Sequence, residues 1–226
     1  MKTSYAMAIA ALCVWSGAAG AQVAPTPAER AAYVGFHAAA AKGEAAEIAR
    51  LAATSAFVDA RDARGRTPYL VAAHAGQRAA MQALVAAGAN PRALDDDRYD
   101  AITIAAVRDD EATMDTAIQL GGDPRAITSP YEGTALIAAA HLGHDGVVRR
   151  LIAAGAPLDH VNNLGWTALI EAVILGDGGP RHVACVKALT QAGANTKRAD
   201  RSGAAPLQLA QARGYGAMVE ILRAAR

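Results

Sequence analysis

Glycine recurs through this chain at an almost constant interval. One series has steps of 33, 33, 34, 33 and 38 residues and runs Gly43, Gly76, Asp109, Gly143, Gly176 and Gly214, with aspartate once in place of glycine. A second series has steps of 33, 34 and 38 residues and runs Gly88, Gly121, Gly155 and Gly193. Both series take their long step between the same two copies, so a single insertion explains both. A fixed period of this length predicts a stack of similar units rather than a domain built around one central core.

The residues between these glycines predict two helices in each unit. Thr67 can cap the first helix, because its side chain accepts a hydrogen bond from a free N–H group, and Pro68 is tolerated in a first helical turn. Apolar residues at helical spacing, such as Val147, Val148 and Leu151, predict the second helix. Glycine after a helix can adopt the left-handed conformation that ends it. A helix pair of this kind cannot bury its apolar face alone, so stability must come from stacking.

With these motifs the chain resembles the ankyrin repeat family. Thr67-Pro68, the Ala-Ala pairs and Gly143-His144 match that family's pattern, and Gly88-Ala89-Asn90 and Gly193-Ala194-Asn195 match the turn that closes each repeat. The resemblance covers about residues 28–226 and implies an all-α ankyrin-repeat solenoid of helix-turn-helix units joined by β-hairpin-like turns. It implies about six units, with the first and last as caps, at residues 28–60, 61–94, 95–127, 128–161, 162–199 and 200–226.

Two units depart from the pattern. The third has Arg98 and Asp100-Ala101 where glycine and Thr-Pro are expected, and Asp109 where a glycine ends the helix. We therefore expect the third unit to be the weakest stacking element. The fifth unit carries the insertion, Gly176 to His182, which we expect to lengthen the loop between its two helices.

The first 21 residues read as a signal peptide. Met1-Lys2 supplies a positive start, Ala6 to Val14 is an apolar run too short to span a bilayer, and Ala19-Gly20-Ala21 matches a cleavage site. Residues 22–27 then form a short extended leader into the repeat domain at residues 28–226. The sequence therefore predicts an exported, periplasmic protein that is cleaved after Ala21. Cleavage leaves one thiol, Cys185, on an apolar helix face, where a buried hydrophobic role is expected.

Composition removes several functional classes. Lys+Arg 22 against Asp+Glu 21 gives no basic surface for nucleic acid, and Cys 2 excludes a disulfide scaffold. No motif of a nucleotide, metal or hydrolase site stands in a suitable context, so the sequence predicts a non-catalytic monomer without cofactor or metal. His37 and His144 fall at family positions whose histidines make structural hydrogen bonds.

The resemblance implies a surface that binds another protein. In ankyrin proteins the hairpin tips and the exposed side of the first helices line a concave groove. Transfer by position predicts these partner-binding residues: Arg64, Arg66, His74, Tyr99, Arg108, Tyr131, His141, Leu142, Leu164 and Trp166. Aromatic residues and arginine are enriched at the centres of protein interfaces. For the aromatic members the alternative is packing against the neighbouring hairpin. The predicted partner is an unidentified periplasmic or envelope protein.

A small-ligand or anion site is the alternative function. In the inserted segment, the backbone N–H groups of Gly178 and Gly179 and the side chains of Arg181 and His182 could together hold an anion. The competing interpretation is a tolerated surface insertion without a ligand.

Overall fold

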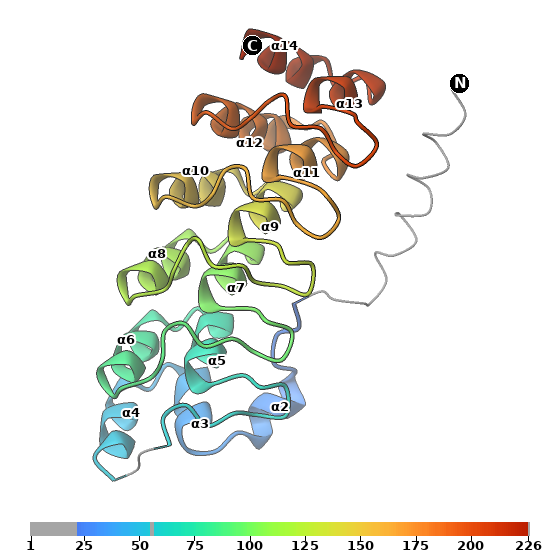
Figure 1. Ribbon diagram of the computed structural model, residues 1–226. Coiled ribbons are helices and arrows are strands. Elements are labelled where there is room, and N and C mark those ends of the chain that lie inside the picture. The colour runs from blue at the N-terminus through green and yellow to red at the C-terminus, as the bar shows by residue number, and fades with distance from the viewer. Residues whose placement is uncertain (1–21, 55–56, 226) are drawn as a thin grey trace.

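The protein is an elongated stack of helix pairs, which follow one another in chain order (Figure 1). The computed structural model describes residues 22–54 and 57–225. A short helix, α2 (Pro27–Ala32), precedes the stack. The first helices of the units, called inner helices below, are α3 (Gly35–Lys42), α5 (Pro68–Ala75), α7 (Ala101–Val107), α9 (Ala135–Leu142), α11 (Ala168–Ile174) and α13 (Pro206–Ala212). The second, outer helices are α4 (Ala45–Ala52), α6 (Arg78–Ala86), α8 (Glu111–Gln119), α10 (Asp145–Ala153), α12 (Pro180–Gln191) and α14 (Gly216–Ala224).

The inner helices begin largely as the sequence predicts, and left-handed Gly43, Gly76 and Gly143 end three of them, whereas α11 ends before Gly176 and is capped by Leu175. The side chain of Thr134 accepts a hydrogen bond from the N–H of Ile137, and Thr167 does the same for Ile170. Asp100 replaces threonine in the third unit and caps α7 through the N–H of Thr103, at 2.7 Å. Aspartate is an equally good capping residue, so this departure keeps the helix start.

The core runs along the stack between neighbouring units. On the inner helices, paired alanines such as Ala72-Ala73 and Ala139-Ala140 are completely buried and let adjacent helices approach closely. On the outer helices, a stripe of larger residues that includes Met81, Leu84 and Leu151 is completely buried against the next unit. These contacts confirm the predicted all-α architecture, in which each unit buries its apolar face on its neighbours.

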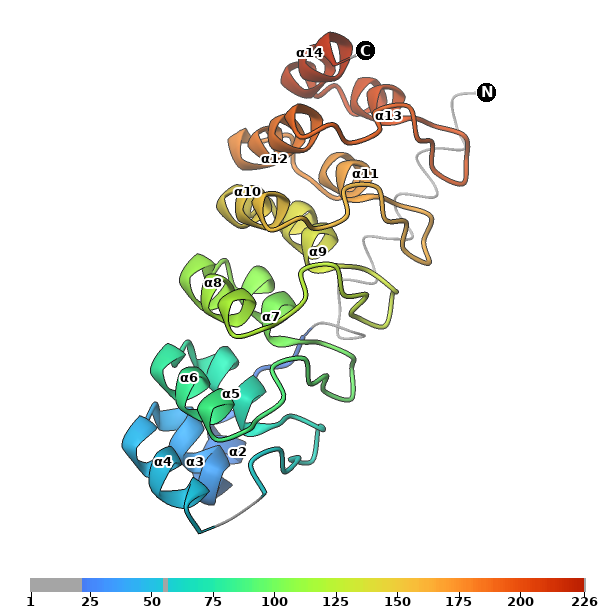
Figure 2. The same ribbon diagram turned by 60° about the vertical axis from the view of Figure 1, so that its left-hand side comes forward.

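The loops between units are joined to one another by backbone hydrogen bonds. The N–H of Asp96 donates to the carbonyl of Arg64, and the N–H of Asn163 donates to the carbonyl of Tyr131. Within residues 22–54 and 57–225 no strand forms, and an isolated antiparallel bridge links Thr128 to Gly133. The loops project beside the inner helices along the stack (Figure 2).

The third unit carries the irregularities that the sequence shows. Arg98 and Asp109 keep the left-handed backbone of the glycines they replace, with φ of 65° and 57°. This conformation is unfavourable for side chains other than glycine. Helix α8 also packs less extensively against α6 and α10 than the other outer helices pack on their neighbours. Both features support weak stacking of this unit.

The insertion in the fifth unit does not lie only in a loop. Helix α12 begins at Pro180 and has 12 residues, whereas α10 has 9. The loop between the two helices is longer, as expected, with residues 175–179 in unit five against residues 143–144 in unit four, and the insertion also extends the second helix at its N-terminus. Gly179 is the residue before this helix, and Pro180 is its first residue. Proline is tolerated there because backbone N–H groups in the first turn of a helix have no acceptor within the helix, so the N–H that proline lacks is not needed.

The segment before α2 runs back along the stack. Residues 22–26 are not helical, and both views place them beside α5, on the side where the inner helices and the loops meet (Figures 1 and 2). The predicted signal peptide, residues 1–21, lies outside the described residues. In the part of the chain that is described, no helix is long and apolar enough to cross a membrane.

Candidate functional site

The surface formed by the inner helices and the adjoining loops, called the inner face here, differs along the stack. The predicted partner-binding residues all belong to this face or its loops. In units two and three, Arg66, His74 and Tyr99 are buried, with 1%, 5% and 6% of each residue exposed. Other parts of the chain cover these three side chains, so a partner could contact them only after a rearrangement, and their role in binding stays a prediction.

Arg66 holds the N-terminal segment to unit two. Its guanidinium lies 2.6 Å from the Glu29 carboxylate and 2.7 Å from the Asp62 carboxylate, and it also donates to the carbonyl of Val23 at 3.2 Å. Tyr33 donates at 2.6 Å to the same Asp62 oxygen, Oδ2, that the guanidinium contacts. Burial alone would raise the pKa of Asp62, but hydrogen bonds from Tyr33 and from Arg66 lower it to about 2. This cluster is a buried clamp between unit two and the chain before it.

His74 lies on α5, and neither of its ring nitrogens has a hydrogen-bond partner among the residues that the structure describes. Burial, with smaller effects from the positive charges of Arg66 and Arg108, lowers the pKa of His74 to about 4. The imidazole is therefore neutral at physiological pH.

Unit four leaves the end of its inner helix accessible, whereas in unit five α11 is buried from Ala168 to Val173 and the accessible predicted residues lie in the loop. His141 and Leu142, at the end of α9, are exposed, with 47% of the His141 side chain and 42% of Leu142 accessible. Tyr131, Leu164 and Trp166 lie in the loops and are half-buried. Arg64 and Arg108 are also exposed. The accessible members of the predicted set thus combine aromatic, aliphatic and basic side chains, most of them in units four and five.

A buried carboxyl group lies next to His141. Glu171 on α11 is 6% exposed, and its Oε1 accepts a hydrogen bond from the side-chain amide of Asn162 at 2.7 Å. The Oε2 atom lies 3.5 Å from Nδ1 of His141. Burial raises the pKa of Glu171 to about 7, although the Asn162 hydrogen bond opposes the change. Burial also lowers the pKa of His141, with a smaller effect from His182.

Sequence reasoning missed Glu171 and Asn162, yet a signal was present. Glu171 lies five residues before the glycine that ends the inner helix, where units two and three have the apolar residues Val71 and Ile104. Asn162 stands five residues before the capping threonine, where unit two has Asp62. A charged residue at an apolar position, with an amide in place of the usual carboxylate, predicts a buried polar pair.

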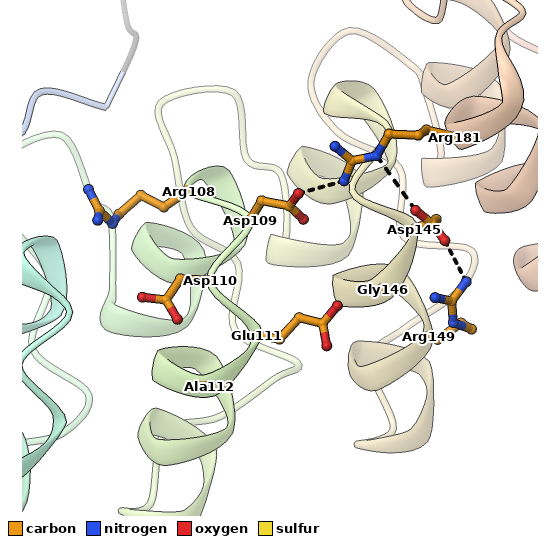
Figure 3. A pocket seen from close by; sticks show the side chains of 9 residues that line it. All are labelled: Arg108, Asp109, Asp110, Glu111, Ala112, Asp145, Gly146, Arg149 and Arg181. Carbon is orange, nitrogen blue, oxygen red and sulfur yellow. Dashed lines mark hydrogen bonds and ion pairs between the residues drawn. The ribbon is translucent and has the colours of Figure 1, made fainter.

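The four residues of the predicted anion site are engaged within the chain. Arg181 lies in a shallow hollow of about 600 Å³, where its guanidinium is 2.5 Å from Asp109 and 3.6 Å from Asp145 (Figure 3). His182 contacts the Asp177 carboxylate at 2.8 Å and the carbonyl of His141 at 2.9 Å.

Gly178 and Gly179 also make contacts within the chain. The N–H of Gly179 donates to the Asp177 carboxylate at 2.8 Å. Gly178 has a φ of 74° and lies against the ring of Tyr215, so an added Cβ would collide with that ring. Because Asp109, Asp145 and Asp177 already supply negative charge here, an incoming anion would meet repulsion.

His37, His144 and Cys185 have structural roles, as the sequence predicts. His37 contacts the carbonyl of Arg66 at 3.0 Å, and His144 contacts the carbonyl of Ala106 at 2.8 Å, so each links two units. Cys185 is completely buried among apolar residues, and burial raises the pKa of its thiol to about 12, as expected for a structural cysteine.

Stacked helix pairs with glycine-ended inner helices and hydrogen-bonded loops define a tandem helical-repeat protein. Models of the ankyrin repeat match residues 64–96 with one copy and residues 102–200 with three. The chain belongs to the ankyrin repeat family. Members of this family are generally protein–protein interaction modules.

Individual relatives agree with this assignment. The chain is 38% identical over 84 residues to the ankyrin repeat protein YahD of Escherichia coli K12, a match that covers 37% of this chain and 42% of that protein. An ankyrin repeat domain from Acinetobacter baumannii AYE superimposes with a TM-score of 0.79 at 40% identity, covering 84% of this chain and 96% of that one. The ankyrin repeat protein EF0377 gives a TM-score of 0.76 at 27% identity, with the same coverages.

Proposed function

We propose that this chain is a non-catalytic protein-binding module that uses the inner face of units four and five and acts in the periplasm. The observation that carries the proposal is the contrast in accessibility along the inner face. His141 and Leu142 are exposed in unit four, whereas His74 at the matching place in unit two is buried. A partner can therefore reach the second half of the stack without rearrangement of the first.

The chemistry of units four and five suits a protein interface. Tyr131 and Trp166 are half-buried, so each side chain is held by its neighbours while part of it stays accessible. Aromatic residues held in this way lose little freedom on binding and are common among residues that dominate binding energy. Leu142 adds an exposed apolar side chain at the C-terminal end of α9.

The place of action is inferred from the predicted signal peptide at residues 1–21. A partner in the periplasm or cell envelope follows from export, and the near-neutral charge of the chain gives no basic surface for nucleic acid. Arg181 and His182 are engaged by carboxylates and a carbonyl of the chain itself, which disfavours the anion-binding alternative.

The test is a pull-down from envelope extract with residues 22–226 as bait. A second bait carries Tyr131→Ala and Trp166→Ala, and a matched control carries Lys187→Ala and Gln191→Ala, which are exposed on the outer helix α12. All three baits are first compared by circular dichroism and urea unfolding.

We expect the control to retain a specific partner and the aromatic double variant to lose it, with affinity about tenfold lower or weaker still. A partner held equally by all three baits would contradict the assignment of this face. Capture by none of them would contradict the binding-module proposal itself.

A further inference from the structure

The inner face of unit two already holds an extended segment of chain. Every residue from Pro68 to His74 on helix α5 is buried, and residues 22–26 lie beside this helix. Thr26 has the extended angles φ −65° and ψ 161°. In unit four His141, at the place that matches His74, is exposed, whereas in unit two the chain's own N-terminal segment lies beside the helix that carries His74.

The segment is held mainly through its backbone and a proline ring. Arg66 donates to the backbone carbonyl of Val23 at 3.2 Å, and Pro25 is the buried side chain of the segment. Val23 and Ala24 are exposed. A backbone carbonyl and a proline ring are features of any extended proline-containing peptide, so the site does not depend on the particular side chains of Val23 and Ala24.

Buried polar atoms of both the segment and α5 lack partners. Among the described residues, neither the ring nitrogens of His74 nor the side-chain nitrogen of Gln22 makes a hydrogen bond, and all three atoms are buried. A buried polar group without a partner is destabilising, and a ligand that supplies the missing partner binds more tightly. The present occupant is therefore not the best one for this surface.

The charges around His74 indicate which side chain would fit better. Arg66 and Arg108 both act on His74 as positive charges. The charge of Arg66 is largely balanced by Asp62 and Glu29, whereas Arg108 at the end of α7 is exposed. A carboxylate brought to this place would accept a hydrogen bond from the imidazole and be attracted by Arg108.

We propose that the inner face of unit two is a docking site for an extended, proline-containing segment of a partner protein, with an acidic side chain three residues before the proline. Residues 22–26 are the internal occupant of this site, and the partner segment exchanges with them. This site is separate from the face of units four and five, and it goes beyond the function proposed above.

The first part of the test asks whether residues 22–26 bury His74. In residues 22–226, Pro25→Asp places a charge at the buried position and frees the segment, while Ala24→Asp, at an exposed neighbour, is the matched control. Both folds are checked by circular dichroism, and the His74 ring signal is assigned with His74→Gln and titrated by NMR. We expect the pKa of His74 to stay about 4 in the control and to rise towards its ordinary value of 6.5 in Pro25→Asp. An unchanged titration in Pro25→Asp would overturn the proposal.

The second part tests exchange on the Pro25→Asp protein, with synthetic peptides as probes. One peptide has the sequence of residues 22–27, a second has glutamate in place of Gln22, and a third has lysine there. We expect all bound peptides to shift the His74 signal, with the glutamate peptide binding about tenfold more tightly than the first and the lysine peptide binding most weakly. Equal affinities would overturn the acidic preference. No shift of His74 with any peptide would overturn the site, while leaving the pull-down on units four and five unaffected.

Discussion

Units two and four place a histidine at the same position, two residues before the glycine that ends the inner helix. His74 is buried without a partner, whereas 47% of the His141 side chain is exposed. The helices around them have the same architecture, so the repeat itself does not decide which side chains are accessible. One difference between the two units is the segment of residues 22–26, which lies beside α5 of unit two and is held there by the hydrogen bond from Arg66 to Val23.

Units two and five make a second pair. Asp62 and Asn162 occupy the same loop position, and each accepts backbone hydrogen bonds that close its loop. Asp62 also binds Arg66, whereas the amide of Asn162 donates to Glu171. An aspartate beside Glu171 would repel it, so the amide and the carboxyl group form a matched pair. In unit two the residue at this loop position, Asp62, binds Arg66, which holds the N-terminal segment. In unit five the matching residue, Asn162, binds the buried carboxyl group of Glu171.

The largest expected effect comes from breaking the clamp of unit two. Arg66→Ala leaves the Asp62 and Glu29 carboxylates without their buried partner and should destabilise the protein by about 3 kcal/mol or more. The exposed neighbour Arg64→Ala is the control and should change stability by less than about 1 kcal/mol. Urea unfolding of the three proteins measures both values. An equal loss of unfolding free energy in the Arg66→Ala and Arg64→Ala proteins would show that Arg66 does not stabilise the contact between unit two and the N-terminal segment.

Glu171, in unit five, should make the stability of the protein fall as the pH rises, which is the opposite of the effect of an acid whose pKa is lowered by folding. Its pKa is about 7 when folded against an ordinary 4.5, so its contribution to stability is complete below pH 4.5 and is lost as the pH rises through 7. Glu171→Gln cannot ionise and should be more stable than the unmodified chain at pH 8, by up to about 3 kcal/mol, with little difference at pH 4. Urea unfolding at both pH values measures the difference. A constant difference between pH 4 and pH 8 would contradict the assignment.

The two histidines should respond differently to the same substitution. His74→Leu removes two unpartnered buried nitrogens and should stabilise the protein by about 1 kcal/mol at pH 7. The gain should grow as the pH falls from 6.5 towards 4, because the unfolded chain binds a proton that the buried imidazole does not. His141→Leu, at the exposed site, should change stability by less than about 0.5 kcal/mol. Thermal unfolding of both variants across this pH range tests the contrast, and similar effects at both sites would refute it.

The smallest expected effect concerns the ion pair between units three and five. Arg181 reaches Asp109 because the insertion extends α12, so two irregularities of the sequence compensate each other. Both side chains are partly exposed, and a double-mutant cycle with Arg181→Ala and Asp109→Gly should give a coupling of about 0.5 kcal/mol. Additive effects of the two substitutions would show that the insertion does not support the third unit.

Most of the fold could be predicted from the sequence because each unit is specified locally. The glycine period, the capping residue at Thr67 and the apolar stripe that includes Leu151 need no knowledge of distant contacts. The loops and helix pairs then follow from the repeat, as in other stacked proteins. The structural roles of His37 and Cys185 were also correctly predicted, since repeat position and helix face decide them.

The candidate site was less predictable because accessibility depends on contacts between distant segments. Nothing in the repeat indicates that residues 22–26 lie beside α5 and bind Arg66, since the segment lies outside the repeats. Arg181 suggested an anion site because its partner Asp109 lies 72 residues before it in the sequence, whereas the carboxylate partner of His182, Asp177, is only five residues away. The insertion lengthens the loop, which spans residues 175–179, and it also extends the helix that begins at Pro180.

The most direct test of this account compares the chemical reactivity of the two matching histidines in the native protein. Residues 22–226 are treated briefly with diethyl pyrocarbonate at pH 7, and modification of each histidine is followed by peptide mass spectrometry, with the urea-unfolded chain as the reference. Because His74 is 5% exposed and 47% of the His141 side chain is exposed, the account predicts that His141 reacts readily and that His74 reacts only after unfolding. Native reaction of His74 at a rate equal to that of His141 would contradict the division of the inner face into a covered half and an open half.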